Sequence, residues 1–260
     1  MALSARTLTG AEAVARATGN NVQLLDATWT LEGSMQSGFL PHTTGSLDTA
    51  AIKAMPVSDR TPDRLAPVFR AASLDSSRPI AVYDRAGLFS APWAWWMLGE
   101  LGLDAALVED AQGGVQGGAT PPKPHPRHFA PKPPLCSTAS LADVLDTDAQ
   151  IVDARSPGRF KGTEPEPRPG LHSGHIPGSL NLPFAKVKSG AGYKSAPVLR
   201  QLVAAIGLQL SRPIITTCGS GVTASGLAFA LTRAGARNVR VYLGSWAEYG
   251  ASDHPAELGG

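Results

Sequence analysis

Cys218 stands at a point in the sequence where a thiol could be held as a nucleophile. It follows the apolar, β-branched run 213–217, and the small-residue loop 219–223 leads directly into a helical pattern. A strand, a tight loop and a helix start in this order direct free backbone N–H groups and the positive end of the helix dipole at the sulfur. Such surroundings lower the pKa of a cysteine thiol and favour the reactive thiolate. The alternative is a small core residue without chemistry.

Several classes of enzyme place a cysteine at such a turn, and the neighbouring residues separate them. A protein tyrosine phosphatase needs an arginine at the end of the loop to clamp phosphate, and this chain has Ala224 there. A Walker-type phosphate loop needs a lysine, which the loop lacks. A papain-like protease takes its histidine base from elsewhere in the chain, and six histidines leave that alternative open.

Length and composition exclude other classes of protein. The chain has 260 residues, of which 43% are hydrophobic, and this is enough for two independent cores. A net charge of +2 gives no signal for a nucleic-acid partner, and no long apolar run predicts a membrane span. The N-terminus lacks an apolar signal core, and two cysteines without a shared motif favour free thiols in a reducing compartment. We expect a cytoplasmic protein that carries no metal and no cofactor.

Shifts in composition divide the chain into two halves joined by a linker. Residues 111–135 are rich first in Gly and then in Pro, which indicates a segment that is flexible at its start and extended at its end. The halves on either side, 1–110 and 136–260, each have the size of an independent domain.

The two halves repeat one pattern in which short buried strands alternate with helices. This alternation predicts an α/β fold in each half, with a mainly parallel sheet covered by helices on both faces. Ligands bind such sheets at the carboxyl ends of the strands, where Cys218 falls. Asp84 takes the place of Cys218 in the first half, so we expect the first domain to be non-catalytic. The matched segments are 24–28 and 151–155, 79–87 and 213–221, the helical patterns 91–102 and 224–235, and the strands 105–109 and 239–243.

The sequence around this cysteine resembles the active-site loop of the mercaptopyruvate sulfurtransferases, a branch of the rhodanese superfamily. The resemblance runs through most of the chain, and its most specific parts are the loop 218–224 and the segment Gly-Thr-Glu-Pro-Glu-Pro-Arg at 162–168. It implies two tandem rhodanese-like domains, of which the second is catalytic and carries the transferred sulfur as a persulfide on Cys218. Further matches lie at 26–29, 83–92, 158–161, 173–179 and 244–248.

The resemblance also implies roles for residues around the cysteine. Arg159 and Arg168 match the family arginines that hold the carboxylate and carbonyl of the sulfur donor, a task that suits a guanidinium fork; two loop charges facing solvent are the alternative. Ser220 matches a serine proposed in the family to pass a proton, and a bond to its own backbone is the competing role. We expect the other loop residues to surround the donor: Gly219, Gly221, Val222 and Thr223.

A donor and an acceptor follow from the same resemblance. It implies that Cys218 takes sulfur from mercaptopyruvate, releases pyruvate, and passes the sulfur to thioredoxin, to a low-molecular-weight thiol or to cyanide. Gly219 and Ser220 are neutral where thiosulfate-using rhodaneses usually carry basic side chains, which favours mercaptopyruvate. Two alternatives stay open: a thiosulfate:cyanide sulfurtransferase, and a persulfide-carrying relay protein with poor turnover.

The segment 37–56 departs from the family pattern. It is shorter than the family segment, which has a His-Ile-Pro-Gly turn, an acidic stretch and a histidine that faces the active site. The position of that histidine corresponds to Ala54 here, with His42 as a weak spatial substitute. Asp48 is expected to stand in for the acidic residue as a donor-binding group.

Other chemistry-bearing residues have simpler interpretations. His172 and His175 have the spacing of a metal pair but fall in a turn, so we expect no metal there. Asp26 and Asp153 are expected to bond backbone N–H groups at strand ends, and Cys136 to be inert. We expect the tryptophans to pack a core or an interdomain face rather than a cofactor: Trp93, Trp95 and Trp96.

Overall fold

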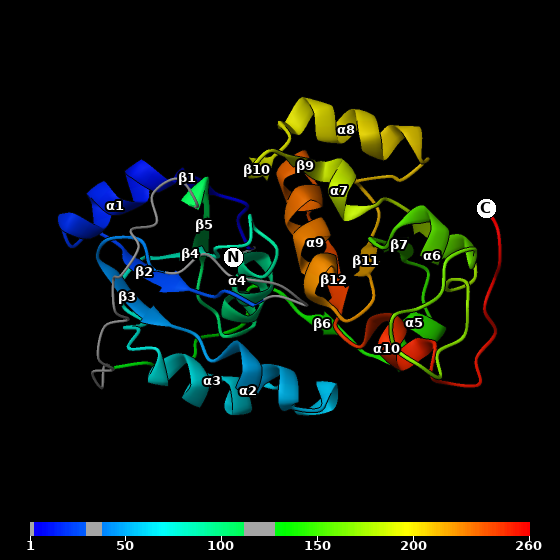
Figure 1. The fold of residues 1–260 in the computed structure, drawn as a ribbon, viewed down its shortest axis with the longest axis horizontal. Helices are drawn as coiled ribbons and strands as arrows, with labels where there is room; N and C mark the ends of the chain where they lie inside the picture. The colour runs from blue at the N-terminus through cyan, green and yellow to red at the C-terminus, as the bar shows by residue number, and fades with distance from the viewer. Residues whose placement is uncertain (1–2, 30–37, 112–127) are drawn as a thin grey trace. The chain divides into compact units, whose positions relative to one another are not determined.

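The computed structural model describes residues 3–29, 38–111 and 128–260 (Figure 1). The chain divides into two compact units, one of Met1–Cys136 with Gly190–Gly192, the other of Ser137–Ser189 with Tyr193–Gly260. Residues 112–127 of the expected linker 111–135, and residue 37 of the segment 37–56, lie outside the described residues. The end of the expected linker, residues 129–135, belongs to the first unit: Phe129 stacks on Phe69, and Lys132 Nζ donates to the Ser76 carbonyl.

The first unit is built on a parallel sheet of five strands in the order β1-β5-β4-β2-β3. Its central strands are buried along their whole length because helices cover both faces of the sheet. The strands are β1 (Thr7–Thr9), β2 (Gln23–Asp26), β3 (Thr43–Ser46), β4 (Ile80–Tyr83) and β5 (Ala105–Glu109). The helices are α1 (Gly10–Thr18), α2 (Thr49–Ala54), α3 (Pro62–Ala71) and α4 (Ala91–Glu100), with a 3₁₀ turn at Val57–Asp59.

Helices α1 and α4 both contribute buried residues to the first unit's core. The α1 residue Ala13 packs against Leu24 and Tyr83 on one side of the sheet. Every residue of α4 is buried, including the three tryptophans, and Trp95 Nε1 donates to the Ser4 carbonyl. The tryptophans therefore form core, as their sequence context indicates.

The second unit repeats the same topology. Its parallel sheet has the order β6-β12-β11-β7-β8, which is the strand order of the first sheet when each is counted along the chain. The strands are β6 (Thr138–Ala139), β7 (Gln150–Asp153), β8 (Leu180–Asn181), β11 (Ile214–Thr217) and β12 (Val239–Tyr242), and a separate two-stranded sheet joins β9 (Lys188–Ser189) to β10 (Gly192–Tyr193). The helices are α5 (Leu141–Leu145), α6 (Pro157–Lys161), α7 (Phe184–Val187), α8 (Ala196–Ala205), α9 (Val222–Ala234) and α10 (Ser245–Tyr249).

Opposite faces of the second sheet pack on different helices. Ile151 and Ile215 share a cluster with Val144 of α5 and Trp246 of α10. The next residue along β11, Thr216, donates to the Ala224 carbonyl of α9 on the other face. The predicted α/β fold with two tandem sheets and helices on both faces is therefore confirmed.

Element boundaries differ from the predicted ranges by one or two residues. Helix α9 begins at Val222 rather than 224, because Gly221 takes a left-handed φ of 84° and acts as the N-cap. Helix α4 ends at Glu100 rather than 102, where Gly102 has a φ of 74°. Glycine adopts both conformations without a steric penalty.

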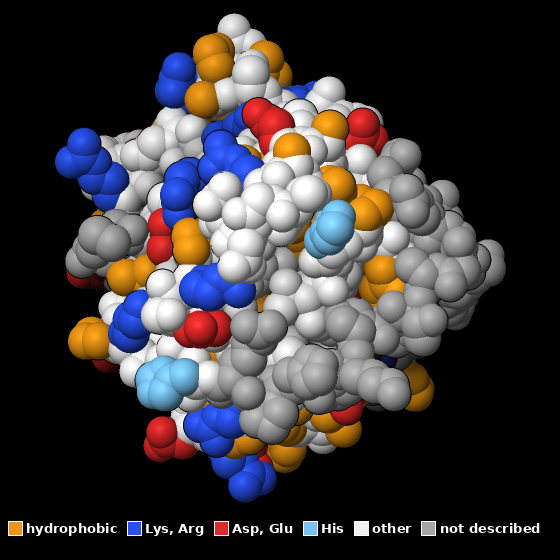
Figure 2. Space-filling model, turned by 90° about the vertical axis from the view of Figure 1, so that its left-hand side faces the viewer, with side chains coloured by type: hydrophobic (Ala, Val, Ile, Leu, Met, Phe, Trp, Pro, Cys, Tyr) orange, Lys and Arg blue, Asp and Glu red, His pale blue; other side chains and the backbone are white. Residues whose placement is uncertain are grey.

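Over the described part of the chain no helix is long and apolar enough to cross a membrane. On the face drawn in Figure 2, lysine and arginine side chains are interspersed with carboxylates. This pattern agrees with the near-zero net charge of the sequence.

Candidate active site

Cys218 directly follows β11 and lies inside the turn that leads to α9. Its sulfur accepts hydrogen bonds from the Ser220 N–H at 3.4 Å and from the Gly221 N–H at 3.2 Å. The residue is 2% exposed. Gly221 is required because a Cβ at this position would lie 2.6 Å from the Leu243 carbonyl oxygen. The predicted amide cradle at the start of a helix is thus present, and it stabilises negative charge on the sulfur.

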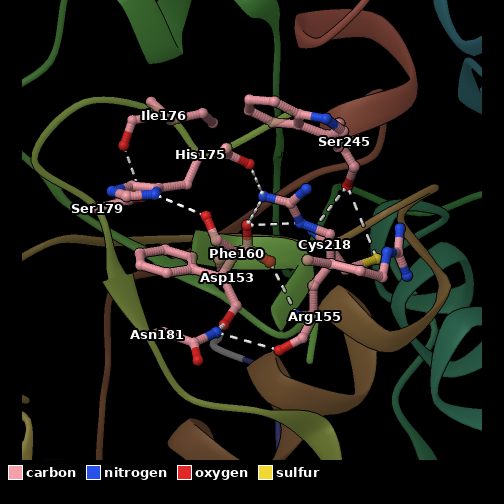
Figure 3. Close-up of polar contacts among 12 residues, drawn as sticks. Asp153, Arg155, Phe160, His175, Ile176, Ser179, Asn181, Cys218 and Ser245 are labelled. Carbon is pink, nitrogen blue, oxygen red and sulfur yellow. Dashed lines mark hydrogen bonds and ion pairs between the residues drawn. The ribbon is translucent and has the colours of Figure 1, made fainter. Parts of the chain in front are cut away.

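The turn between β12 and α10 forms hydrogen bonds with the backbone of this loop. Ser245 Oγ accepts from the Cys218 N–H at 3.1 Å, donates to the Tyr242 carbonyl at 2.7 Å and lies 3.9 Å from the Cys218 sulfur (Figure 3). The Trp246 and Ala247 N–H groups donate to the carbonyls of Cys218 and Gly219. Ser245 is fully buried at a φ of 52°, a strained conformation for a residue with a side chain. Sequence reasoning gave Ser245 no role, although it lies in the matched segment 244–248.

The two arginines predicted to bind the donor both lie beside the cysteine loop. Arg159 is carried by α6, whose N-cap Ser156 accepts from the Arg159 N–H, and its Nη2 would lie 2.8 Å from a Cβ built on Gly219. Arg168 is exposed and its Nη1 donates to the Gly219 carbonyl at 3.3 Å. The glycine at 219 therefore leaves the space that Arg159 occupies.

Three charged side chains that are at most 4% exposed lie behind Arg159, whose own side chain is 24% exposed. We call Asp153, Arg155, Glu166 and Arg159 the charged quartet. Glu166 accepts from Arg159 Nε at 3.1 Å and Nη2 at 2.6 Å, and from Arg155 Nη1 at 2.8 Å. Arg155 also donates to Asp153 through Nε and Nη2 at 2.9 and 2.7 Å (Figure 3), and its guanidinium lies 4.3 Å from the ring centre of Trp246. Arg155 and Glu166 were missed by sequence reasoning because isolated charges in a loop resemble solvent-facing ones.

The remaining predicted residues of the loop lie at the start of α9. Val222, 2% exposed, is the first residue of the helix, and Thr223 is half-buried. Ser220 contributes its backbone N–H to the sulfur cradle. Its expected role in proton transfer stays a prediction.

Asp48 belongs to the first unit, where it is exposed and caps α2 by accepting from the Ala51 N–H at 2.8 Å. Its expected contact with the donor stays a prediction. His42 is exposed at a φ of 63°, and Ala54 is the last residue of α2.

His175, Asp153 and Cys136, to which the sequence assigned structural roles or none, each have local partners. His175 Nδ1 lies 2.8 Å from the Phe160 carbonyl oxygen and its ring stacks on Phe160, whereas His172 is exposed. Asp153 accepts from the Arg155 N–H at the end of its strand. The Cys136 sulfur donates to the Trp96 carbonyl, and burial together with Glu100 raises the pKa of its thiol.

The first unit contains a second amide cradle at the position equivalent to Cys218. There the Asp84 carboxylate accepts from the N–H groups of Ala86, Leu88, Ser90 and Ala91 at 2.6 to 2.9 Å. Asp84 is 1% exposed. Burial raises the pKa of its carboxyl, and the four amide donors oppose that rise.

Comparison with known proteins decides the family. The Rhodanese-like domain family matches residues 137–252. The 3-mercaptopyruvate sulfurtransferase of Escherichia coli (strain K12) is 36% identical over 209 residues, which cover 75% of this chain and 74% of the relative. The chain belongs to the mercaptopyruvate sulfurtransferase family. It is therefore a sulfurtransferase with two tandem rhodanese-like domains.

Further relatives of this sulfurtransferase match nearly the whole chain. The human 3-mercaptopyruvate sulfurtransferase is 31% identical over 283 residues, covering 97% of this chain and 95% of the relative. The crystal structure of the Escherichia coli 3-mercaptopyruvate sulfotransferase SseA has a TM-score of 0.77 and 26% identity over 92% of this chain and 98% of that one.

Proposed function

We propose that this sulfurtransferase takes the sulfur of 3-mercaptopyruvate on Cys218, releases pyruvate, and passes the sulfur to a thiol acceptor. One observation carries the proposal: the Cys218 sulfur receives two amide N–H groups in a loop flanked by Arg159 and Arg168. The cradle suits a thiolate and a persulfide, and the arginines suit an α-keto carboxylate.

The chemistry is a covalent sulfur transfer. The Cys218 thiolate attacks the donor's sulfur, a sulfur–sulfur bond forms, and the carbon–sulfur bond breaks. The electron pair of the broken bond passes to the pyruvate carbon as an enolate, which takes up a proton to give pyruvate. Ser220, two residues after Cys218 in the sequence, is proposed to pass that proton. The amides of Ser220 and Gly221 stabilise the charged sulfur at each stage.

The acceptor is proposed to be a reduced thiol of thioredoxin type, a small thiol or cyanide. Attack of the acceptor thiolate on the outer sulfur breaks the sulfur–sulfur bond and returns the Cys218 thiolate. A reducing cytoplasmic compartment would supply such thiols and keep both cysteines free.

Pyruvate release tests the proposal. Purified enzyme is assayed with mercaptopyruvate, with and without reduced thioredoxin, and kcat/KM is compared with that for thiosulfate and cyanide. We expect mercaptopyruvate to be the better donor and reduced thioredoxin to accelerate turnover. A large advantage for thiosulfate would show that the donor assignment is wrong.

Stoichiometry separates an enzyme from a sulfur relay. The departure of the segment 37–56 from the family pattern motivates the relay as a second candidate. Rapid formation of one Cys218 persulfide per chain, followed by negligible pyruvate release with every acceptor, would favour the relay.

A further inference from the structure

Glu166 is a carboxylate whose side chain is only 4% exposed and which bonds two arginines at once. It accepts from both donors on one edge of the Arg159 guanidinium, Nε and Nη2. A two-point contact fixes the plane of the guanidinium as well as its position. Glu166 therefore determines which way Arg159 faces beside the cysteine loop.

The charges around this contact nearly cancel. Asp153 and Glu166 are negative and Arg155 and Arg159 are positive, so the charged quartet is neutral. Arg168, which bonds the Gly219 carbonyl from the exposed side, adds one positive charge. The cysteine loop itself carries no charged side chain between Gly219 and Thr223. Apart from the Cys218 sulfur itself, these side chains sum to one positive charge, which matches a donor with one negative charge better than a dianion.

We infer that Glu166 determines the charge of the donor that this enzyme accepts. It orients Arg159 toward a carboxylate and at the same time cancels its charge, so that a monoanion such as mercaptopyruvate is favoured over a dianion such as thiosulfate. This inference rests on the proposed function of the same site. Glu166 is a positioning residue, because it acts through Arg159 rather than by touching the donor.

A purely structural role for Glu166 predicts a different result. If Glu166 only braced Arg155 against Asp153 and Trp246, its loss would loosen the loop and slow the reaction with every donor alike. A role in donor charge predicts changes of opposite sign for the two donors. The two donors therefore separate these roles within one variant.

The test is Glu166→Gln, which keeps the shape of the side chain and removes one negative charge. We expect KM for mercaptopyruvate to rise several-fold with little change in kcat, because Arg159 loses its two-point contact. We expect kcat/KM for thiosulfate to rise by about tenfold and to become more sensitive to salt. A parallel fall for both donors would overturn the inference.

Two further variants show whether the charge at position 166 causes the change in donor preference. Glu164→Gln removes a charge from the same segment, where Glu164 is exposed and bonds the Ser156 hydroxyl, and should change the donor ratio by less than about twofold. Glu166→Asp keeps the charge and should preserve the donor ratio while KM rises for both. If Glu166→Asp shifts the ratio as far as Glu166→Gln, or Glu164→Gln does so, charge at position 166 is not the determinant.

The inference and the proposed function fail in different ways. An unmodified enzyme that turns over no mercaptopyruvate would contradict the proposed function. The sign of the thiosulfate change in Glu166→Gln would still decide the role of Glu166. Should Glu166→Gln lose its cooperative thermal unfolding, Glu166→Asp still tests the inference: because the charge is kept, a shift of its donor ratio toward thiosulfate would overturn it.

Discussion

The Asp84 loop of the first unit and the Cys218 loop of the second follow equivalent strands of two sheets with the same strand order. In the first, four amide N–H groups converge on a carboxylate that belongs to the chain. In the second, two amides and the turn at Ser245 surround a sulfur. The repeated fold thus provides an anion cradle twice, and the first unit fills it permanently with its own side chain.

The strand-end aspartates show a second difference between the units. In the first unit Arg85, the residue after Asp84, places its Nη2 3.2 Å from Asp26, so the arginine comes from the cradle loop itself. In the second unit Asp153 is paired with Arg155, which comes from the same strand end. Position 219, after the cysteine, can therefore be glycine, and the space beside it is occupied by Arg159. The Cys218 and Asp84 cradles differ in which segment supplies the positive charge.

Replacing the sulfur should have the largest effect on activity. Cys218→Ser removes the nucleophile but keeps a small group that the same amides can bond, so the fold should survive while turnover falls by at least about a thousandfold. Mass spectrometry after donor treatment should detect no added sulfur atom. Persulfide on this variant, in the absence of persulfide on Cys136, would contradict the assignment.

Removing the Asp84 carboxylate should lower the stability of the fold rather than the rate of sulfur transfer. Asp84→Ala leaves four N–H groups without an acceptor, three of them buried, at about 1–3 kcal/mol for each buried group, so we expect a loss of about 4 kcal/mol or more in the free energy of unfolding. Urea unfolding followed by the fluorescence of the buried tryptophans of α4 measures it.

Asp48→Ala is the matched control for that variant. Asp48 bonds one N–H at an exposed helix N-cap, and its loss should cost about 1 kcal/mol. Equal losses for the two variants would show that the Asp84 amides do not depend on the carboxylate.

A methyl group at position 219 should displace Arg159. Gly219→Ala places a Cβ 2.8 Å from Arg159 Nη2, and because the guanidinium is the end of a flexible side chain it moves rather than the backbone. We expect KM for the donor to rise by about tenfold and the free energy of unfolding to change by less than about 1 kcal/mol.

Gly207→Ala serves as the control for this substitution. Gly207 has a φ of 73° and open space around it, so alanine there should cost about 1 kcal/mol of stability and leave KM unchanged. A similar rise in KM for both variants would indicate a general loosening of the second unit.

The smallest effect is expected at the other cysteine. Burial and the neighbouring Glu100 raise the pKa of the Cys136 thiol, so its thiolate is scarce at and well above neutral pH. Cys136→Ser should change turnover by less than about twofold. Alkylation near neutral pH should modify Cys218 alone, and peptide mapping that finds Cys136 modified first would contradict this.

Much of the fold followed from local sequence. The apolar run before Cys218 predicted β11, and the glycines after it predicted a tight turn, because only glycine takes the left-handed φ of Gly221 without strain. The match between segments 79–87 and 213–221 predicted two equivalent sheets, and both have the same strand order. Helix ends shifted by one or two residues, since caps rather than apolar periodicity set them.

The sequence alone thus indicated Cys218 as the candidate nucleophile, its strand–loop–helix setting and the repeat in which Asp84 takes the equivalent position. Only the tertiary structure joined Arg155, Glu166 and Ser245 to the site, because Ser245 bonds the cysteine loop from another turn and Glu166 links Arg155 to Arg159. The sequence does not indicate which residue a charged or hydroxyl side chain in a loop will contact. The role of such a side chain is decided by which parallel strands end side by side at one edge of the sheet.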